Sequence, residues 1–263
     1  MQKDSPSLWF SISADRRYEG IEECFVQVDQ EAWAKSLLEN YDVVKKEFTD
    51  YLEANGMVPY FHQSMVNRKD TWKTLGLKFW NIELYKYRSH FPLTYRWLKQ
   101  HPDVIALSYS KLEPFSRILP HAGDTNGIYR VHLGIDVPEG LPRCGFRVKD
   151  EKRSWGEREF LGFLDAFEHE AWNETEKSRV IMMIDVIRPE FRKKQSYICK
   201  QVIASLALQK LAAMLLLHNH KPEAKPMAVP LWFRRFMALG MLGAVYILLP
   251  ARNAAAFVKS KFS

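Results

Sequence analysis

The chain has 263 residues, of which 47% are hydrophobic and 26% charged, the proportions of an ordinary globular protein. This composition excludes a largely disordered chain, a collagen-like chain and a polytopic membrane protein. The formal net charge is +7, but residues 192–263 hold 12 Lys or Arg and a single acid, Glu223, which gives 12 − 1 = +11. Residues 1–191 then hold 26 basic and 30 acidic residues. A basic tail on a mildly acidic body indicates that the tail contacts an anionic partner.

The cysteines point to a reducing compartment. Cys24, Cys144 and Cys199 are far apart and form no CxxC pair, which argues against a zinc ribbon or a redox pair. An odd number of cysteines also argues against a disulfide framework, so we expect the protein in the cytoplasm. The first twenty residues contain no apolar run of the kind that a cleaved signal peptide needs.

The first part of the chain has the spacing of helices. Within residues 20–55, an acidic Asp29-Gln30-Glu31 start precedes apolar residues that recur at intervals of three and four: Trp33, Leu37, Leu38, Tyr41, Val44 and Phe48. Further on, Pro92 is expected to open a helix that includes Trp97 and Leu98. The sequence therefore predicts an N-terminal helical region, residues 1–103, that packs on the rest of the protein.

From about residue 104 the pattern changes to short apolar or alternating runs. Gly, Pro, Asn and Asp separate the predicted strands, which are Val104–Leu112, Ile128–Val137, Cys144–Val148, Glu159–Leu164 and Arg179–Ile187. Runs of this length with turn residues between them are typical of an all-β barrel or sandwich. Residues 104–191 are therefore the predicted β core of a mainly β protein with flanking helices.

After Pro189 the sequence predicts a third region, residues 192–263, with two strongly apolar helices. The helices are expected at residues 201–218 and 231–249, and the segment HNHKPEAKP, which contains two prolines, forms a linker after the first helix. The second helix is charge-free only over residues 236–251, whereas a helix that crosses a bilayer needs about 20 apolar residues.

Two interpretations of this apolar pair stay open. The pair can pack on the body or form a dimer face. Alternatively, residues 201–263 lie on an anionic membrane surface, with their Lys and Arg on the headgroups. Nucleic acid is not expected as a partner, because the basic residues alternate with long aliphatic runs.

Three of the eight histidines, His121, His132 and His169, lie in the predicted β core. His121 stands before a Gly-rich turn, His169 follows 48 residues later, and Arg179 starts the next predicted strand. A double-stranded β-helix barrel can hold Fe(II) between two such histidines and bind a dicarboxylate through the arginine. The usual third ligand, a carboxylate two residues after the first histidine, is replaced by Gly123. From spacing alone, an iron site and a set of unrelated polar residues at strand ends both remain open.

Four segments occur in order along the chain: LPHAGDTNGIYRVHLGIDVP, SWGEREF, FLDAFEHEAWN and SRVIMMIDVIRPEF. With SYSKLEP upstream, they resemble the aspartyl/asparaginyl β-hydroxylase family of Fe(II)/2-oxoglutarate-dependent dioxygenases over about residues 72–191. The resemblance implies a double-stranded β-helix, of the jelly-roll or cupin type, and hydroxylation of an aliphatic C–H bond with Fe(II), 2-oxoglutarate and O2. We interpret Trp155 and Trp172, which lie in these segments, as core aromatics.

The resemblance also implies roles for individual residues. His121 and His169 match the two iron-ligating histidines, and the peptide-hydroxylating branch of the family likewise has a glycine where Gly123 stands. Arg179 matches the arginine that pairs with the C5 carboxylate of 2-oxoglutarate, and Ser110 matches a serine that donates to the same carboxylate. A planar guanidinium is suited to such a two-point contact.

A second group of residues is expected around the other end of the cosubstrate. Arg130 and His132 alternate on one strand face and match the pair near the C1 carboxylate, and Arg130 also reaches the substrate as a catalytic residue. Asp165 matches one acid of a pair that precedes FEHE. A second substrate-binding arginine of the peptide hydroxylases falls at Ile128, which carries no charge.

Three functions follow as hypotheses. The first is hydroxylation of the β-carbon of an Asp/Asn-type side chain in a peptide or an amino acid. The second is the same chemistry on a lipid acyl chain, with the enzyme on the inner face of a membrane, and it is favoured by Ile128 and the basic apolar tail. The third is a binding module that keeps the barrel without turnover, and the intact His121, His169 and Arg179 argue against it.

Overall fold

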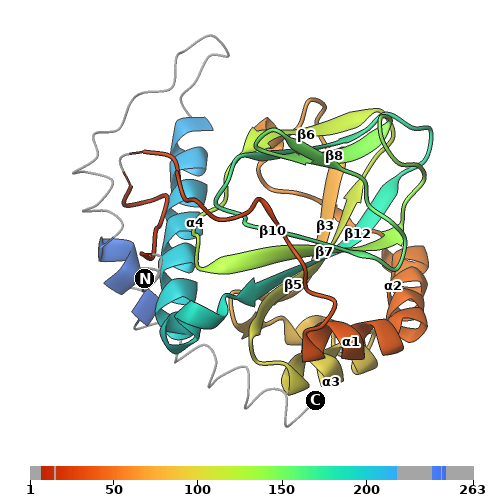
Figure 1. Cartoon of the computed structure of the whole chain (residues 1–263), viewed down its shortest axis with the longest axis horizontal. Helices are drawn as coiled ribbons and strands as arrows, with labels where there is room; N and C mark the ends of the chain where they lie inside the picture. The colour runs from red at the N-terminus through yellow and green to blue at the C-terminus, as the bar shows by residue number, and fades with distance from the viewer. Residues whose placement is uncertain (1–6, 15, 218–238, 244, 247–263) are drawn as a thin grey trace.

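The computed structural model describes residues 7–14, 16–217, 239–243, 245 and 246. Two antiparallel sheets face each other, and helices flank the larger sheet (Figure 1). The strands are β1 (Phe25–Val26), β2 (Val58–Pro59), β3 (Trp72–Phe79), β4 (Ile82–Glu83), β5 (Val104–Leu112), β6 (Ser116–His121), β7 (Ile128–Asp136), β8 (Cys144–Val148), β9 (Glu151–Arg153), β10 (Phe160–Phe163), β11 (His169–Asn173) and β12 (Arg179–Ile187). The α-helices are α1 (Ala32–Glu39), α2 (Tyr41–Asn55), α3 (Pro92–Gln100) and α4 (Gln195–Leu217), and the 3₁₀ helices are Gln63–Met65, Tyr85–Tyr87 and Pro189–Lys194.

The strand order is that of a double-stranded β-helix, as predicted. The larger sheet runs β1-β10-β7-β12-β5-β3-β2, with β4 paired to β3, and the smaller sheet runs β6-β11-β8-β9. From β5 to β8, and again from β10 to β12, successive strands alternate between the two sheets. The chain therefore winds around a common interior, and the ends of strands that are distant in sequence meet at one opening of the barrel.

The predicted strands are all present, but the chain contains further strands that the pattern did not predict. Between residues 116 and 173 the unpredicted strands are β6, β9 and β11, which are short and rich in polar residues. Residues 1–103 are also not helical throughout, because β3 pairs with β5 in the larger sheet, from Trp72↔Leu112 to Lys78↔Leu107. The β-barrel therefore extends into the region that was expected to be helical.

The predicted N-terminal helix forms as two helices, α1 and α2, which meet at Asn40. Their apolar residues are buried against α3 and the outer face of the larger sheet, and Phe48 stacks on Tyr109 of β5 with ring centroids 4.1 Å apart. Pro92 opens α3, as predicted. The buried Glu47 of α2 accepts hydrogen bonds from the backbone nitrogens of Leu93 and Thr94, at 2.6 and 3.1 Å, so a carboxylate from α2 satisfies the N-terminus of α3.

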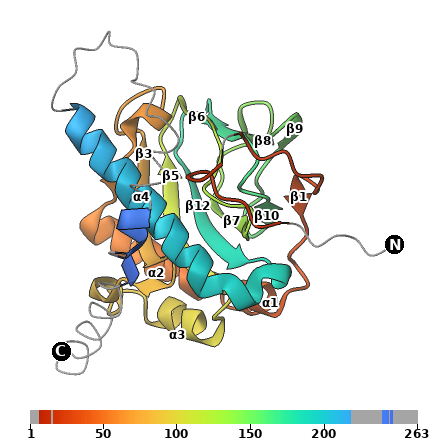
Figure 2. The ribbon, with the colours of Figure 1, turned by 90° about the vertical axis from the view of Figure 1, so that its left-hand side faces the viewer.

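The first helix of the basic tail packs on the barrel. It forms as α4, which begins at Gln195 and lies along the side of the β-structure (Figure 2). Its residues Ile198, Cys199 and Val202 are buried against a cluster that includes Ile105 and Ile128. For this helix, packing on the body is therefore the observed arrangement.

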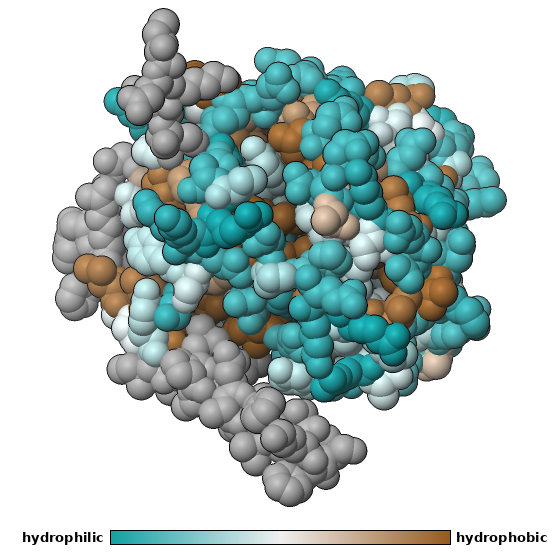
Figure 3. Space-filling model, turned by 60° about the horizontal axis from the view of Figure 1, so that its bottom comes forward, coloured by the Kyte–Doolittle hydropathy of each residue, from teal (hydrophilic) through white to brown (hydrophobic). Residues whose placement is uncertain are grey.

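Most of the second predicted tail helix, residues 231–249, lies outside the described residues. Its described part, residues 239–243, 245 and 246, is helical. Val245 is buried there, and the Lys200 Nζ lies 3.8 Å from the centroid of the Tyr246 ring. Within the described part of the chain, no helix is both long enough and apolar enough to span a membrane. On the face that Figure 3 presents, hydrophilic residues cover most of the surface and hydrophobic residues form small separate patches.

One ion cluster joins the larger sheet to the turn after β5 and gives a pH-dependent prediction. Glu113 Oε1 lies 2.8 Å from Lys73 Nζ and 3.2 Å from Lys111 Nζ, and its Oε2 accepts a 2.6 Å hydrogen bond from Ser178. Burial raises the pKa of Glu113, but the hydrogen bonds from Lys73, Ser178 and Lys111 outweigh it and lower the pKa to about 2. The folded state therefore gains stability from ionised Glu113 above the pKa of the unfolded chain, and loses it as the pH falls toward that lowered value.

We expect Glu113→Gln to lower the free energy of unfolding by about 1–2 kcal/mol at neutral pH, after allowance for the partial exposure of the cluster. The difference from wild type should shrink as the pH falls below the unfolded-state pKa, because the wild-type carboxylate then takes up a proton on unfolding. Urea unfolding of both proteins at neutral and acidic pH measures this. A stability difference that stays constant with pH would contradict the assigned ion cluster.

Candidate active site

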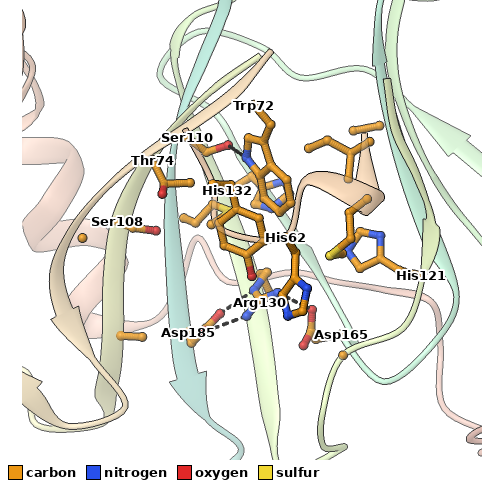
Figure 4. A pocket seen from close by; sticks show the side chains of 18 of the residues that line it. His62, Trp72, Thr74, Ser108, Ser110, His121, Arg130, His132, Asp165 and Asp185 are labelled. Carbon is orange, nitrogen blue, oxygen red and sulfur yellow. Dashed lines mark hydrogen bonds and ion pairs between the residues drawn. The ribbon is translucent and has the colours of Figure 1, made fainter. Parts of the chain in front are cut away.

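A cavity of 810 Å³ opens between the two sheets at one end of the barrel. It brings together all the residues that the sequence assigned to the site, five of which are labelled in Figure 4. These residues come from five strands and one loop: Ser110, His121, Arg130, His132, Asp165, His169 and Arg179. The predicted site residues are therefore neighbours in space, although they span 70 positions of the chain from Ser110 to Arg179.

The two predicted iron ligands lie side by side on neighbouring strands. His121 ends β6, His169 begins β11, and the two residues are paired in the sheet with ring centroids 4.2 Å apart. The Nδ1 of His121 lies 2.8 Å from the carbonyl oxygen of Leu119, and the Nδ1 of His169 lies 2.8 Å from that of Phe167. Each Nδ1 therefore donates to the backbone, which leaves both Nε2 lone pairs available to a metal ion.

The surroundings keep both imidazoles neutral, the state that binds metal. Burial lowers the pKa of His121 to about 4, and the positive charge of Arg130 contributes to the shift. Burial also lowers the pKa of His169 well below its ordinary value, with His121 and Arg130 acting in the same direction. Among the described residues, no group of three or more His, Cys, Asp and Glu side chains is placed to hold a metal ion.

Asp165 fills the space where a side chain at position 123 would begin. A Cβ atom on Gly123 would lie 1.7 Å from Asp165 Oδ2 and 2.9 Å from the Asp165 carbonyl oxygen, to which the Gly123 nitrogen donates. Asp165 Oδ1 is 3.7 Å from His169 Nε2 and accepts a 2.7 Å hydrogen bond from Arg130. Burial raises the pKa of Asp165, and the Arg130 guanidinium opposes that rise. The absence of a side chain at Gly123 thus admits a carboxylate from a different loop.

We expect Gly123→Ala to destabilise the protein by about 1–3 kcal/mol, because the added methyl group has to displace Asp165 from Arg130. Gly76→Ala is a matched control, because a Cβ there would meet only Leu84 Cδ1, at 3.6 Å. Thermal unfolding of both variants against wild type measures the effect. Equal and small shifts in Tm for the two variants would show that the close approach of Asp165 is unimportant.

At the other side of the cavity, Arg179 is a buried cation with unused hydrogen-bond donors. Its side chain is 1% exposed, and its Nε and Nη1 have no hydrogen-bond partner among the described residues. Burial lowers its pKa to about 10, so the guanidinium remains charged at neutral pH. Because a buried charge with unpaired donors is costly, this arrangement fits a site that an anionic ligand completes.

Two tryptophans orient the polar groups beside Arg179. Trp72 Nε1 donates to Ser110 Oγ at 3.0 Å, so the Ser110 hydroxyl hydrogen is free to point elsewhere (Figure 4). Trp155 Nε1 donates to His132 Nδ1 at 3.1 Å, which places the hydrogen of the neutral imidazole on Nε2. That Nε2 is buried without a partner among the described residues, as are the two Arg179 nitrogens. The cavity therefore presents several N–H and O–H donors toward one region.

The interpretation of Trp155 as a core aromatic was incomplete. Trp155 is buried, but it also orients His132 and lies under the Arg179 guanidinium, whose carbon is 4.5 Å from the ring centroid. Trp172 fits the interpretation, since it is buried and donates to the Pro142 carbonyl at 2.7 Å. Trp72 was not singled out in the sequence at all. Its role depends on β3, a strand that the sequence pattern did not predict.

Arg130 is held by two acidic side chains, as Figure 4 shows. Its Nε and Nη2 donate to the two oxygens of Asp185, at 2.7 and 2.9 Å, and its Nη1 donates to Asp165 at 2.7 Å. Burial lowers the pKa of Arg130, but the two carboxylates outweigh it and raise the pKa above its ordinary value. Three of the five guanidinium hydrogens are thus used, and two remain for a ligand. Asp185 was not predicted as part of the site.

The chain is similar in sequence to known hydroxylases. An ornithine lipid ester-linked acyl 2-hydroxylase of Rhizobium tropici is 32% identical over 162 residues, which are 60% of this chain and 58% of that protein. An aspartyl/asparaginyl beta-hydroxylase of Mus musculus is 40% identical over 90 residues, which are 34% of this chain and 12% of that protein. The chain therefore spans less than two thirds of the length of these relatives.

Among solved structures, a predicted oxalate decarboxylase of Thermotoga maritima is 10% identical, with 50% of this chain and 94% of that chain covered and a TM-score of 0.34. This likeness is too weak to support a statement about the fold, which follows from the strand order alone. The sequence model of the aspartyl/asparaginyl beta-hydroxylase family matches residues 38–189, which are more than half of the chain and include every candidate site residue. The chain belongs to the aspartyl/asparaginyl beta-hydroxylase family.

Proposed function

We propose that this protein is an Fe(II)- and 2-oxoglutarate-dependent hydroxylase that acts on the β-carbon of an Asp/Asn-type side chain in a peptide or an amino acid. One observation carries the proposal. The same cavity contains two neutral histidines with free Nε2 atoms and a buried arginine with two unpartnered nitrogens. The two histidines are suited to a metal ion, and the arginine is suited to the carboxylate of a cosubstrate.

Different residues of the cavity would bind the two ends of the cosubstrate. Arg179 and the Ser110 hydroxyl would bind the C5 carboxylate of 2-oxoglutarate, and His132 would donate its Nε2 hydrogen to the C1 end. Iron on His121 and His169, together with 2-oxoglutarate and O2, would supply the oxidation that inserts oxygen into an aliphatic C–H bond and releases succinate and carbon dioxide. The protein provides orientation and a mostly apolar enclosure that limits access of water.

Arg130 is the group best placed to recognise the substrate. Its two remaining guanidinium hydrogens can donate to a side-chain carboxylate or amide, and the clamp by Asp165 and Asp185 holds the guanidinium in a fixed orientation. The name of the mouse relative, an aspartyl/asparaginyl beta-hydroxylase, supports such a substrate. Ile128 is fully buried next to Ile105 and Ile198, so no second cation at this position contributes to binding.

A lipid acyl chain is a second candidate substrate. The Rhizobium tropici relative, whose name states activity on an ornithine lipid, matches over a longer stretch than the mouse relative does. Three hydrophobic side chains that line the cavity, Val58, Phe61 and Phe79, are also exposed, at 68%, 48% and 40%. An exposed apolar rim is compatible with a substrate that is extracted from a membrane surface, and the basic residues of 201–263 would support contact with that surface.

The two candidates can be separated in one experiment. The protein is incubated in air with Fe(II) and 2-oxoglutarate, and with either a panel of Asp- and Asn-containing peptides and amino acids or vesicles of bacterial membrane lipids. Mass spectrometry then looks for a gain of one oxygen atom, with His169→Ala as the control. We expect the gain on the peptide or amino-acid panel. A gain on lipids alone would assign the second substrate class, and the absence of both products and succinate would indicate a non-catalytic barrel.

A further inference from the structure

The cavity has a wall that lies outside the part of the chain matched by the family. The match ends at residue 189, whereas Leu206 and Gln209 of α4 line the same cavity as His121 and Arg179. In Figure 2, α4 runs along the side of the barrel over most of its width. The cavity that contains the histidines and arginines of the site is thus lined in part by a segment that lies beyond the matched residues.

This wall is fixed firmly to the loop that follows His121. Asp124 Oδ1 accepts hydrogen bonds from Ser205 Oγ at 2.7 Å and from Gln209 Nε2 at 3.2 Å, both of α4. The same oxygen accepts a 2.9 Å hydrogen bond from Ser11 of the N-terminal segment. A single carboxylate, three residues after a candidate iron ligand, therefore connects α4, the N-terminal segment and the site loop.

Packing holds the helix at the same place. Ile198, Val202 and Ala204 are buried at 1% exposure or less. A Cβ atom on Gly127, in the loop after His121, would lie 2.9 Å from Ile198 Cδ1, so helix and loop are in close contact. Leu206 packs partly buried against the cluster that contains Ile198 and Val202, and the exposed Gln209 is held by its hydrogen bond to Asp124. Both residues are therefore fixed in place along the cavity.

We infer that α4 is the substrate-selecting wall of this cavity, and that Leu206 and Gln209 limit the size and polarity of the substrate segment beside the target carbon. The inference rests on the proposed function because it treats the bound molecule as a substrate. The position of α4 along the cavity does not depend on that function. The Leu206 side chain is aliphatic and the Gln209 amide is neutral, and three further lining residues, Phe61, Phe79 and Trp80, carry no charge. Asp124 and Lys78 also line the cavity, but Asp124 is bonded to Ser11, Ser205 and Gln209, and Lys78 Nζ donates to the Val104 carbonyl oxygen. A substrate segment that passes α4 therefore meets neutral groups at Leu206 and Gln209.

The test uses thiol chemistry at one position of the wall. The three cysteines of the chain are all buried, so Leu206→Cys adds a thiol in the cavity against a low background. Leu208→Cys is the matched control, because Leu208 lies on the same helix and is not among the cavity-lining residues. Both full-length variants are treated with methanethiosulfonate reagents of increasing size. The reaction rate is followed by mass spectrometry, without iron or any substrate.

We expect the thiol at position 206 to react at least ~10-fold more slowly with the largest reagent than with the smallest, since a cavity discriminates by size. The thiol at position 208 should show a much weaker dependence. The same size dependence at both positions would overturn the inference. This first arm needs no turnover, so it holds even if the proposed function is wrong.

The second arm uses the labelled proteins as catalysts. A large uncharged adduct at position 206 should lower kcat/KM for the responsive peptide at least ~10-fold, whereas the same adduct at position 208 should leave it nearly unchanged. Fe(II) binding, measured by competition with a chelator, should be the same in both. If labelling at position 206 depends on reagent size but neither wild type nor the variants form product, the proposed substrate is rejected and the assignment of α4 as a cavity wall stands. Equal loss of product at both positions would reject the wall and keep the enzyme.

Discussion

Replacing either His121 or His169 with alanine is expected to abolish Fe(II) binding and 2-oxoglutarate turnover, with a loss of at least ~100-fold. The physical reason is the small number of protein ligands. The two imidazoles lie 4.2 Å apart with both Nε2 atoms free, and among the described residues no third His, Cys, Asp or Glu completes a metal-binding group with them. Removal of one ligand leaves a single imidazole, which cannot retain the ion. Equilibrium competition with a chelator and succinate formation both measure the effect.

His90→Ala provides the control for these variants, because His90 is exposed and its ring packs on Tyr51, away from the cavity. It should bind Fe(II) as wild type does. Because the pKa of His121 is lowered to about 4, protons compete with the metal only in acidic solution, and Fe(II) affinity should fall as the pH approaches that value. Wild-type Fe(II) affinity in either alanine variant would show that the ion is bound elsewhere.

The second large effect is expected at Arg179. Arg179→Lys keeps a positive charge but loses the planar two-point contact, so the KM for 2-oxoglutarate should rise by roughly 10- to 150-fold, the equivalent of about 1.5–3 kcal/mol. The effect is expected to be large because Arg179 is buried and its Nε and Nη1 have no hydrogen-bond partner among the described residues.

Arg147→Lys is the matched exchange outside the cavity. Arg147 on β8 pairs with Glu168 and Glu170 at the surface of the smaller sheet, so its replacement should leave the KM for 2-oxoglutarate unchanged. Initial-rate kinetics with 2-oxoglutarate as the varied component measure both variants. An unaltered KM in Arg179→Lys would mean that the guanidinium does not contact the cosubstrate.

The sequence pattern predicted the strands that have long apolar runs and could not predict the others. β5, β8 and β12 begin and end at the predicted residues, because turn residues bound their apolar runs. β6 ends at His121 and β11 begins at His169. Both strands carry polar residues, so their sequences show no clear alternation of polar and apolar residues. β3 has Lys and Thr between its apolar residues, and its place in the sheet depends on pairing with β5, a contact between distant parts of the chain.

The residues of the candidate site were likewise predicted only in part. The segments shared with the family identified His121, His132, His169, Arg130 and Arg179, and the fold places these residues in one cavity. The partners that orient them, Trp72, Trp155 and Asp185, depend on tertiary contacts that no local spacing encodes. Asp185 did leave a sign in the sequence, since an acid in the middle of the apolar strand RVIMMIDVI has to be paired when it is buried.

The most direct test of the proposed chemistry is the fate of isotopically labelled O2 in the presence of the protein, Fe(II), 2-oxoglutarate and the responsive substrate. Mass spectrometry of the products follows the label. We expect one labelled oxygen atom in succinate and one in the hydroxylated substrate, with neither product formed by His169→Ala. Substrate hydroxylation without labelled succinate, or wild-type protein that forms no Fe(II)-dependent succinate under any of these conditions, would contradict the assignment of this cavity.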